Sequence, residues 1–305
     1  MSYDLYFYAR KENEFDAGKV EAYLLDHGCV REDEFEQWVY ENDNTDVYFV
    51  FERQPENDDP EDIATFESFD DFANTRFSFS LNFIRPNFFG LEAFPFVERM
   101  LCELDLFALN LQSSSEIEIP RRQAAEEYYS NWSNTNLSFS SDHFDYFGLL
   151  HFPLEKSNEY WRYNFHKDQM QEKLGDEYFV PTLILARHGS TGEPITRSTW
   201  TQHIPNVFPP ADYFLLNRRK RKLFRTVEES GIISRACLMR EFGPYLDPFD
   251  FKDCFIIHPE NAALVGDQFN NIEFEAILEG FLGEGIDISK LTNAERSAVQ
   301  KDLGD

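Results

Sequence analysis

The sequence predicts an α+β fold, with an antiparallel or mixed sheet that carries helices on one face and a second α+β part after it. Phenylalanine and leucine alternate with serine and asparagine over residues 77–83, which is the period of a half-buried strand. After Gly90, apolar residues recur every three or four positions up to Leu104, as on one face of a helix. The chain of 305 residues is long enough for two domains of about 100–200 residues each.

Residues 76–107 are the expected core of the first part. Pro86 cannot donate a hydrogen bond to a neighbouring strand, so the strand should end before it. Pro95 fits only near the start of a helix, which predicts that the next helix begins close to it. Before this region, the apolar patterns predict strands over residues 3–9, 34–40 and 47–53 and a helix over residues 17–25.

The second part gives weaker signals. The polar run at residues 112–115 is the best linker candidate, and it divides the chain into residues 1–111 and residues 116–305. Beyond the linker, helical periodicity and short apolar runs suggest further elements. We expect helices over residues 122–132, 159–174, 272–281 and 293–303, and strands over residues 179–186, 213–216 and 254–257.

The chain is strongly acidic, with 56 Asp and Glu against 28 Lys and Arg and a net charge of -28. Residues 1–115 hold 26 acidic and 8 basic residues, whereas residues 116–305 hold 30 and 20. Nucleic acids and anionic membranes repel such a surface, so we expect neither as a partner. The charge suits a basic protein partner, or it serves solubility alone. The oligomeric state stays open.

The cysteines and the N-terminal residues bear on the compartment. The four cysteines are widely spaced and none forms a Cys-x-x-Cys pair, so we expect free thiols in the cytoplasm. The N-terminal residues do not resemble a signal peptide, and no apolar run reaches the length of a membrane span. The sequence holds no glycine-rich nucleotide motif and no zinc-ligand spacing, so we expect no cofactor and no metal.

Residues 55–75 are the best candidate for a functional surface. Asp59 followed by Pro60 is a typical helix start, with a capping residue and a proline at the first helical position. Carboxylates at the rim and phenylalanines at the centre would bind a cationic partner. An equally open interpretation is a solvated loop whose phenylalanines pack on the core. The candidate partner-binding residues are Asp58, Asp59, Glu61, Asp62, Phe66, Glu67, Phe69, Asp70 and Asp71.

Arg187-His188-Gly189 is an alternative site, because it follows an apolar run as the same triplet does in histidine phosphatases. There the histidine attacks phosphate and arginines neutralise the phosphoryl oxygens. Here the triplet lies past the middle of the chain, and the later candidate His258 is followed by proline instead of glycine. The alternative function is a phosphatase-like hydrolase that uses Arg187 and His188. The competing interpretation is a loop at the end of a strand.

One basic cluster occurs at residues 218–225. It would suit a phosphate or nucleic-acid site if it were free. In a chain this acidic, the pairing of these side chains with the protein's own carboxylates is the favoured interpretation. The cluster consists of Arg218, Arg219, Lys220, Arg221, Lys222 and Arg225.

Three blocks of the chain, residues 1–11, 79–100 and 199–224, resemble bacterial proteins that serve as immunity proteins of polymorphic toxin systems. The resemblance implies a cytoplasmic inhibitor that binds and blocks a cognate toxin without catalysis. Immunity proteins share a role rather than a motif, so the resemblance assigns no catalytic residue. The acidic charge agrees with this role, since an acidic surface can cover the basic cleft of a toxin.

Overall fold

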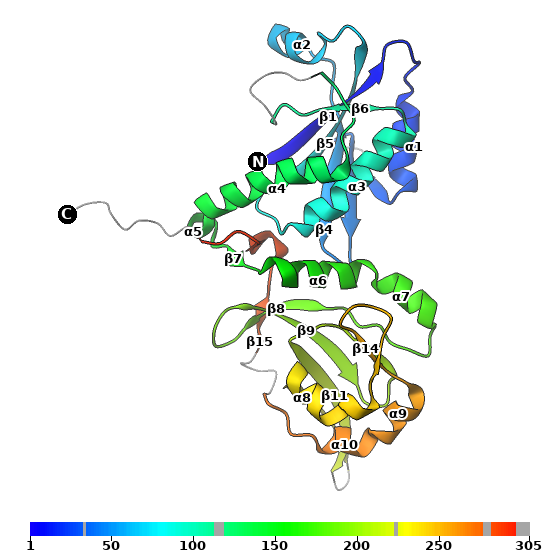
Figure 1. Cartoon of the computed structure of the whole chain (residues 1–305), viewed down its shortest axis with the longest axis vertical. Helices are drawn as coiled ribbons and strands as arrows, with labels where there is room; N and C mark the ends of the chain where they lie inside the picture. The colour runs from blue at the N-terminus through cyan, green and yellow to red at the C-terminus, as the bar shows by residue number, and fades with distance from the viewer. Residues whose placement is uncertain (33–34, 113–118, 223–224, 277–281, 297–305) are drawn as a thin grey trace, which may run out of the picture. The chain divides into compact units, whose positions relative to one another are not determined.

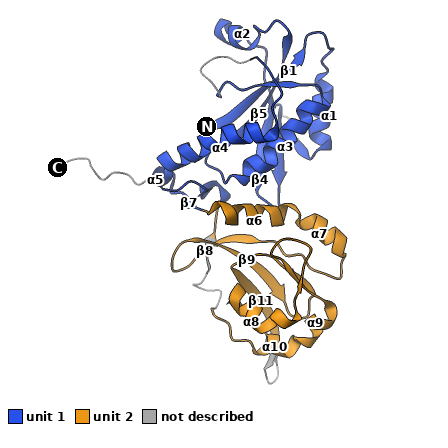
Figure 2. Ribbon diagram, in the orientation of Figure 1, with its two compact units in different colours: residues 1–151, 288–305 blue, residues 152–287 orange. Residues whose placement is uncertain are grey.

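The computed structural model describes the chain except residues 33–34, 113–118, 223–224, 277–281 and 297–305 (Figure 1). Residues 1–151 and 288–305 form one compact unit, unit 1, and residues 152–287 form another, unit 2 (Figure 2). Each unit combines helices with its own sheet, so the predicted α+β class is confirmed. Among the described helices, none is long and apolar enough to cross a membrane.

Unit 1 is built on a six-stranded sheet in the order β2-β3-β4-β5-β1-β6, and every neighbouring pair is antiparallel. Strands β1 and β4 agree with the strands predicted over residues 3–9 and 47–53. The short strands β2 and β6 carry too few alternating residues to be recognised from the sequence. The strands are β1 (Ser2–Arg10), β2 (Cys29–Glu32), β3 (Gln37–Asn42), β4 (Val47–Arg53), β5 (Phe72–Asn82) and β6 (Phe107–Leu109).

The remaining elements of unit 1 are helices and one short strand pair. The strand pair, β7 (Leu150–His151) with β16 (Leu291–Thr292), is parallel and joins residues 291–292 to this unit. The helices are α1 (Ala17–Asp26), α2 (Pro60–Phe66), α3 (Phe88–Glu103), α4 (Ala125–Asp142), α5 (Phe144–Phe147) and the 3-10 turn η2 (Ile288–Lys290).

The core of unit 1 is an aromatic cluster between the sheet and α3. The Phe96 ring of α3 lies 5.4 Å from that of Phe49 and 5.6 Å from that of Phe51, both on β4. Phe79 of β5, which is fully buried, lies 5.4 Å from Phe51 and 6.0 Å from Phe94. The apolar residues at 77, 79 and 81 all lie on the buried face, as predicted, whereas between them Ser78 is also buried and Ser80 is half-buried.

The expectation that Pro95 stands near the start of a helix is wrong. Helix α3 begins at Phe88 and continues through Pro95 to Glu103. An internal proline removes a backbone hydrogen bond and destabilises a helix by about 3 kcal/mol. Pro95 is exposed, so its ring lies on the solvent side of the helix. The burial of Phe94 and Phe96 on the other side of the helix offsets the cost.

Helix α4 packs directly on α3, which moves the boundary between the compact units. Gly90 of α3 faces Trp132 of α4, and a Cβ atom at position 90 would lie 2.8 Å from the indole ring. Tyr128 and Trp132 are fully buried. Because this contact ties α4 to α3, residues 119–151 belong to unit 1, and the compact units do not divide at residues 112–115 as expected.

Unit 2 contains a five-stranded mixed sheet in the order β12-β11-β9-β8-β15, in which β11 and β9 run parallel. A smaller antiparallel sheet has the order β10-β14-β13. The strands are β8 (Ile184–His188), β9 (Pro194–Thr201), β10 (Asn206–Phe208), β11 (Tyr213–Lys222), β12 (Arg225–Ser234), β13 (Asp247–Pro248), β14 (Phe255–Ile257) and β15 (Leu282–Gly285).

The buried centre of unit 2 is Trp200 on β9. Its indole makes edge contacts with the rings of Phe208, Phe242 and Phe269 at 4.9, 5.0 and 4.7 Å. These phenylalanines come from β10 and from two helices, so one tryptophan joins three parts of the unit. The helices are α6 (Leu154–Phe165), α7 (Lys167–Leu174), α8 (Arg235–Phe242), α9 (Pro259–Leu264), α10 (Gly266–Asn271) and the 3-10 turn η1 (Gly243–Tyr245).

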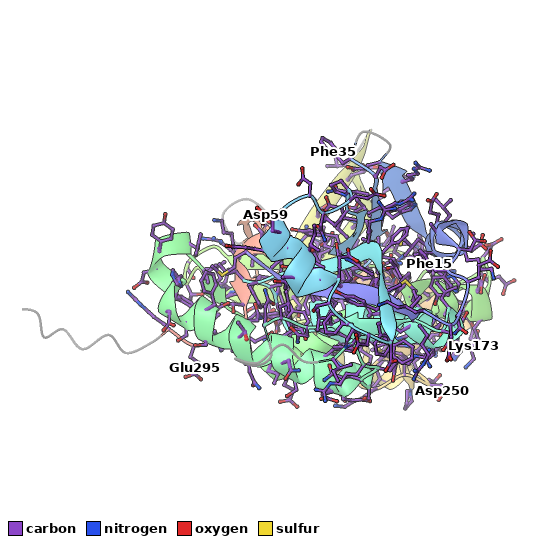
Figure 3. All side chains as sticks on the ribbon, turned by 90° about the horizontal axis from the view of Figure 1, so that it is seen from above. Phe15, Phe35, Asp59, Lys173, Asp250 and Glu295 are labelled. Atoms are coloured by element: carbon purple, nitrogen blue, oxygen red, sulfur yellow. The ribbon has the colours of Figure 1, made fainter. Side chains whose placement is uncertain are left out.

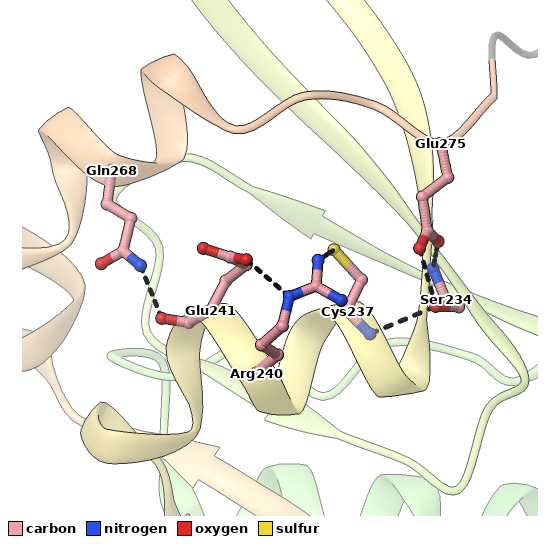
Figure 4. Close-up of polar contacts among 6 residues, drawn as sticks. All are labelled: Ser234, Cys237, Arg240, Glu241, Gln268 and Glu275. Atoms are coloured by element: carbon pink, nitrogen blue, oxygen red, sulfur yellow. Dashed lines mark hydrogen bonds and ion pairs between the residues drawn. The ribbon is translucent and has the colours of Figure 1, made fainter.

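Polar contacts at both ends of α8 fix this helix in unit 2 (Figure 4). At its start, the Ser234 hydroxyl accepts a hydrogen bond from the Cys237 amide at 3.1 Å and donates one to Glu275 at 3.2 Å. At its end, the Gln268 amide donates to the Glu241 carbonyl at 2.6 Å. The cap satisfies an amide that no helical carbonyl can reach.

Several expected elements of the second half differ from the structure. The helix expected over residues 159–174 is divided into α6 and α7 at His166, and α4 extends ten residues past the predicted end at 132. Residues 272–276 and 293–296 are not helical, and the rest of those two predicted helices lies outside the described residues. The apolar run at 179–186 becomes a strand only from Ile184 onward.

Candidate functional site

The acidic segment, residues 55–71, connects β4 to β5 in unit 1 and contains α2. As predicted, Asp59 caps this helix: its carboxylate accepts a hydrogen bond from the Glu61 amide at 2.8 Å, and Pro60 occupies the first turn. Glu61 and Asp62 also lie in the first turn, where the helix dipole stabilises negative charge. Figure 3 shows Asp59 at the surface of the molecule, at the end of this helix.

All seven carboxylates that we selected from the sequence are exposed. None of the seven forms an ion pair with a lysine or arginine in the described part of the chain. Of the seven, Glu67 is the one whose carboxylate has side-chain partners among the residues that the structure describes: it accepts hydrogen bonds from Asn57 and Asn74 at 3.4 and 3.2 Å. The seven carboxylates therefore face solvent without a lysine or arginine partner among the described residues. Two cations do contact the segment elsewhere, since Lys11 donates to the Phe69 carbonyl at 2.8 Å and Arg76 pairs with Glu56.

The two phenylalanines of the predicted site are half-buried and pack on the sheet. The ring of Phe66 lies 4.7 Å from that of Tyr6, and the ring of Phe69 lies 5.3 Å from that of Tyr8. The Phe66 carbonyl accepts a hydrogen bond from the Tyr8 hydroxyl at 3.0 Å. The rings therefore attach the segment to the core while its carboxylates face water, and its role as a binding surface stays a prediction.

A cavity of about 340 Å³, here named the α2 pocket, lies between this segment and the sheet. Asp58 and Asp62 line it together with the ion pair between Arg76 and Glu56, whose atoms are 3.2 Å apart. The half-buried rings of Tyr6 and Phe66 also line it. Burial raises the pKa of Tyr6, and the carboxylates of Asp4, Asp62 and Glu52 raise it further. The pocket is thus a negative site whose lining includes the rings of Tyr6 and Phe66.

The charge of the two units is unequal. Unit 1 holds 35 Asp and Glu against 13 Lys and Arg, a balance of -22, whereas unit 2 holds 21 against 15, a balance of -6. Residues 55–71 contribute eight acidic residues and no Lys, Arg or His. The acidic segment is therefore the most concentrated part of an already acidic unit.

Unit 2 contains a larger cavity, here named the α6 cavity, of about 770 Å³. The Lys156 ammonium of α6 lies 2.7 Å from one carboxylate oxygen of Asp212 and 3.0 Å from the other. Asp212 also accepts hydrogen bonds from the amide and hydroxyl of Thr196 at 2.9 and 3.1 Å. Arg235 lines the same cavity and donates to the carbonyls of Pro209 and Asp253. Lys156, Asp212 and Arg235 therefore all have hydrogen-bond partners within unit 2.

His188 lines the α6 cavity at the end of β8, whereas Arg187 is exposed and does not line it. The loop after His188 is a hairpin into β9, closed by a hydrogen bond from the His188 amide to the Glu193 carbonyl at 2.9 Å. The imidazole Nδ1 lies 3.1 Å from the Ser190 hydroxyl oxygen. His258, the other histidine considered, contacts the Tyr178 hydroxyl at 2.7 Å and does not line the α6 cavity.

The basic cluster is engaged where the structure describes its side chains. Arg218 is buried and pairs with Glu229 at 3.2 Å, and Arg219 pairs with Glu228 at 3.0 Å. The interpretation that the cluster pairs with the protein's own carboxylates is confirmed for these two arginines. The side chains of residues 220–226 lie outside the described part.

The contacts of Lys156 and Thr196 with Asp212 could not be predicted from the sequence. Lys156 lies on α6, Thr196 on β9 and Asp212 just before β11, so tertiary packing brings them together and no local motif marks them. Among the described residues, no group of three or more His, Cys, Asp or Glu side chains is placed to hold a metal ion. Comparison of the chain with protein-family models, curated proteins and solved structures gives no match.

Proposed function

We propose that this protein is an immunity-type inhibitor of the cytoplasm that binds a basic protein, a cognate toxin, through the acidic segment of unit 1. The observation that carries the proposal is the set of seven exposed carboxylates at residues 58–71 that have no lysine or arginine partner among the described residues. A basic partner supplies the missing cations. Binding covers the partner's functional surface, and no bond is made or broken.

The physical argument rests on where the charge lies. Unit 1 has a balance of -22, so its field attracts a basic protein over a distance of roughly one Debye length, about 8 Å at physiological ionic strength. Exposed carboxylates mainly speed the encounter and select the partner. Final affinity depends on buried contacts, which the carboxylates alone do not supply.

A capture experiment tests the proposal. The wild-type protein and a charge-neutralised variant, Asp58→Asn/Glu61→Gln/Asp62→Asn, are each immobilised and exposed to lysate of the source cell at low salt. Asp59 is left unchanged because it caps α2. The matched control, Glu12→Gln/Glu14→Gln/Asp26→Asn, removes the same charge from exposed positions elsewhere on unit 1.

We expect the wild type and the control to retain one basic protein that the first variant loses. The retained protein must also be inactivated by the purified wild type in its own assay. A captured protein that is acidic, or one that all three forms retain equally, would remove the support for this proposal.

A phosphatase-like hydrolase is the second candidate, favoured by one observation: His188 lines a cavity of about 770 Å³ together with Lys156 and Arg235. Cationic groups beside a nucleophile would stabilise a phosphoryl group. The position of Arg187 outside this cavity argues against the arrangement expected from its triplet. The two candidates differ in a simple assay, since only the hydrolase releases phosphate.

A further inference from the structure

The α2 pocket holds two carboxylates that lack a partner cation. Asp58 and Asp62 line it, and neither forms an ion pair with a described lysine or arginine. Arg76 is the one cation among the described residues that line the pocket, and it forms an ion pair with Glu56 at 3.2 Å. The charge of these four residues is therefore -2, and a single added cation would reduce it.

The pocket also offers aromatic surface to a cation. Tyr6 and Phe66 line it, their rings are 4.7 Å apart with an angle of 53°, and both are half-buried. Cations bind the faces of such rings, and a planar guanidinium stacks on them better than an ammonium does. Unit 1 already uses this contact, since Arg10 lies 5.1 Å from the ring of Phe107.

The electrostatic environment of Tyr6 supports the same occupant. Burial is the main cause of the raised pKa of Tyr6, and the carboxylates of Asp4, Asp62 and Glu52 raise it further. The smaller contribution, from the three carboxylates, reports a negative potential, which favours a cation at the same place. The cavity of about 340 Å³ lies at the lower end of the usual range of about 300–1,000 Å³ for ligand sites, which suits one side chain.

We propose that the α2 pocket receives one arginine side chain of the partner, with its guanidinium over Tyr6 and Phe66 and its N–H groups donating to Asp58 and Asp62. This inference rests on the proposed function and adds the chemistry of the contact. Arginine is preferred to lysine because its planar group can stack on a ring and donate two hydrogen bonds in its plane at once.

The experiment uses the whole protein and a defined probe, tetra-arginine amide, at 0.15 M NaCl. Aromatic NMR resonances of Tyr6 and Phe66 report binding in the pocket. Asp58→Asn/Asp62→Asn removes the two pocket carboxylates. Asp70→Asn/Asp71→Asn is the matched control, because it removes the same charge from the same segment at exposed residues that do not line the pocket. Tyr6→Leu keeps both carboxylates but removes a ring.

We expect saturable shifts of both rings and a Kd that rises about tenfold in Asp58→Asn/Asp62→Asn but less than about threefold in the control. Tyr6→Leu should weaken tetra-arginine more than tetra-lysine. If tetra-arginine binding is weakened equally in the two charge variants, the proposal that arginine enters the α2 pocket is wrong, and the acidic surface as a whole is the binding face. Absence of ring shifts in the wild type would overturn that proposal as well, while the capture experiment would still test the proposed function separately.

Discussion

The indole of Trp132 on α4 lies so close to Gly90 on α3 that a Cβ atom at position 90 would be 2.8 Å from the ring. Tyr129 is equally near, at 2.9 Å. Since Gly90 lies within a regular helix, the glycine is required here by the approach of α4 and not by backbone conformation.

Gly90→Ala should therefore destabilise unit 1, although alanine is normally the better helix residue. We expect a loss of about 1–3 kcal/mol, because buried aromatic rings must shift to admit the methyl group. Thermal or urea unfolding measures it. Gly243→Ala is the control, since a Cβ atom there meets nothing closer than 3.8 Å. Equal stability of the two variants would show that α4 does not pack on α3 as described.

Substitution of Glu92 tests how the β3–β4 hairpin of unit 1 is held against α3. Its buried carboxylate accepts hydrogen bonds from Tyr40, Asn42 and Thr45 at 3.0, 2.6 and 3.0 Å, and so holds the β3–β4 hairpin against α3. Glu92→Ala leaves three donors without this acceptor and should cost about 3 kcal/mol or more. Glu103→Ala, at an exposed position of the same helix, should cost less than about 0.5 kcal/mol. A small loss at Glu92 would contradict the network.

The cysteines should differ sharply in reactivity. Cys102 is exposed, whereas Cys29, Cys237 and Cys254 are buried. Burial raises the pKa of Cys29 and of Cys254 to about 12, so their reactive thiolates are scarce at pH 8. A thiol reagent should label one cysteine rapidly in the native protein and all four in denaturant. Rapid native labelling of Cys29 would contradict its burial.

The raised pKa of the Cys29 thiol predicts that the protein loses stability at alkaline pH. The folded-state pKa of Cys29 is raised from 9.0 to about 12, so the folded state retains a proton that the unfolded state loses. Its contribution to stability is fully present below pH 9 and is lost as the pH rises toward 12. Cys29→Ala should reduce the fall in unfolding free energy between pH 9 and pH 11, measured by urea titration. An unchanged fall would assign the sensitivity to other groups, such as the buried tyrosines.

Local patterns predicted those parts of the fold that local forces determine. The alternation around Phe79 and the cap formed by Asp59 are both properties of neighbouring residues, and both were predicted correctly. Pro95 was placed wrongly, because the burial of its neighbours in the core overrides the local preference against an internal proline. The contact of Gly90 with Trp132 joins two helices through tertiary packing, which no local pattern contains.

Only part of the candidate site could be predicted from the sequence. The charge of residues 55–71 is a property of composition, so it could be predicted, and the structure shows these carboxylates exposed. The α2 pocket could not, because Tyr6 comes from a distant strand. Likewise, nothing near Asp212 in the sequence indicates that Lys156 and Thr196 hold it.

The hydrolase alternative has its own test. On the proposed function, His188 performs no chemistry, so the wild type should release no phosphate from an aryl phosphate above background. His188→Ala should leave toxin neutralisation unchanged. Substantial wild-type turnover that disappears in His188→Ala would favour the hydrolase instead, and Arg187→Ala would then show whether the exposed arginine takes part.

The salt dependence of association with the captured partner tests the central claim most directly. Association and dissociation rates are measured from low to high salt for wild type, Asp58→Asn/Glu61→Gln/Asp62→Asn and the control Glu12→Gln/Glu14→Gln/Asp26→Asn. We predict that association of the first variant is about tenfold slower at low salt, that the difference disappears at about 1 M salt, where the Debye length is about 3 Å, and that the control stays close to wild type. Association of the first variant at the wild-type rate in low salt would contradict the acidic segment as the binding face.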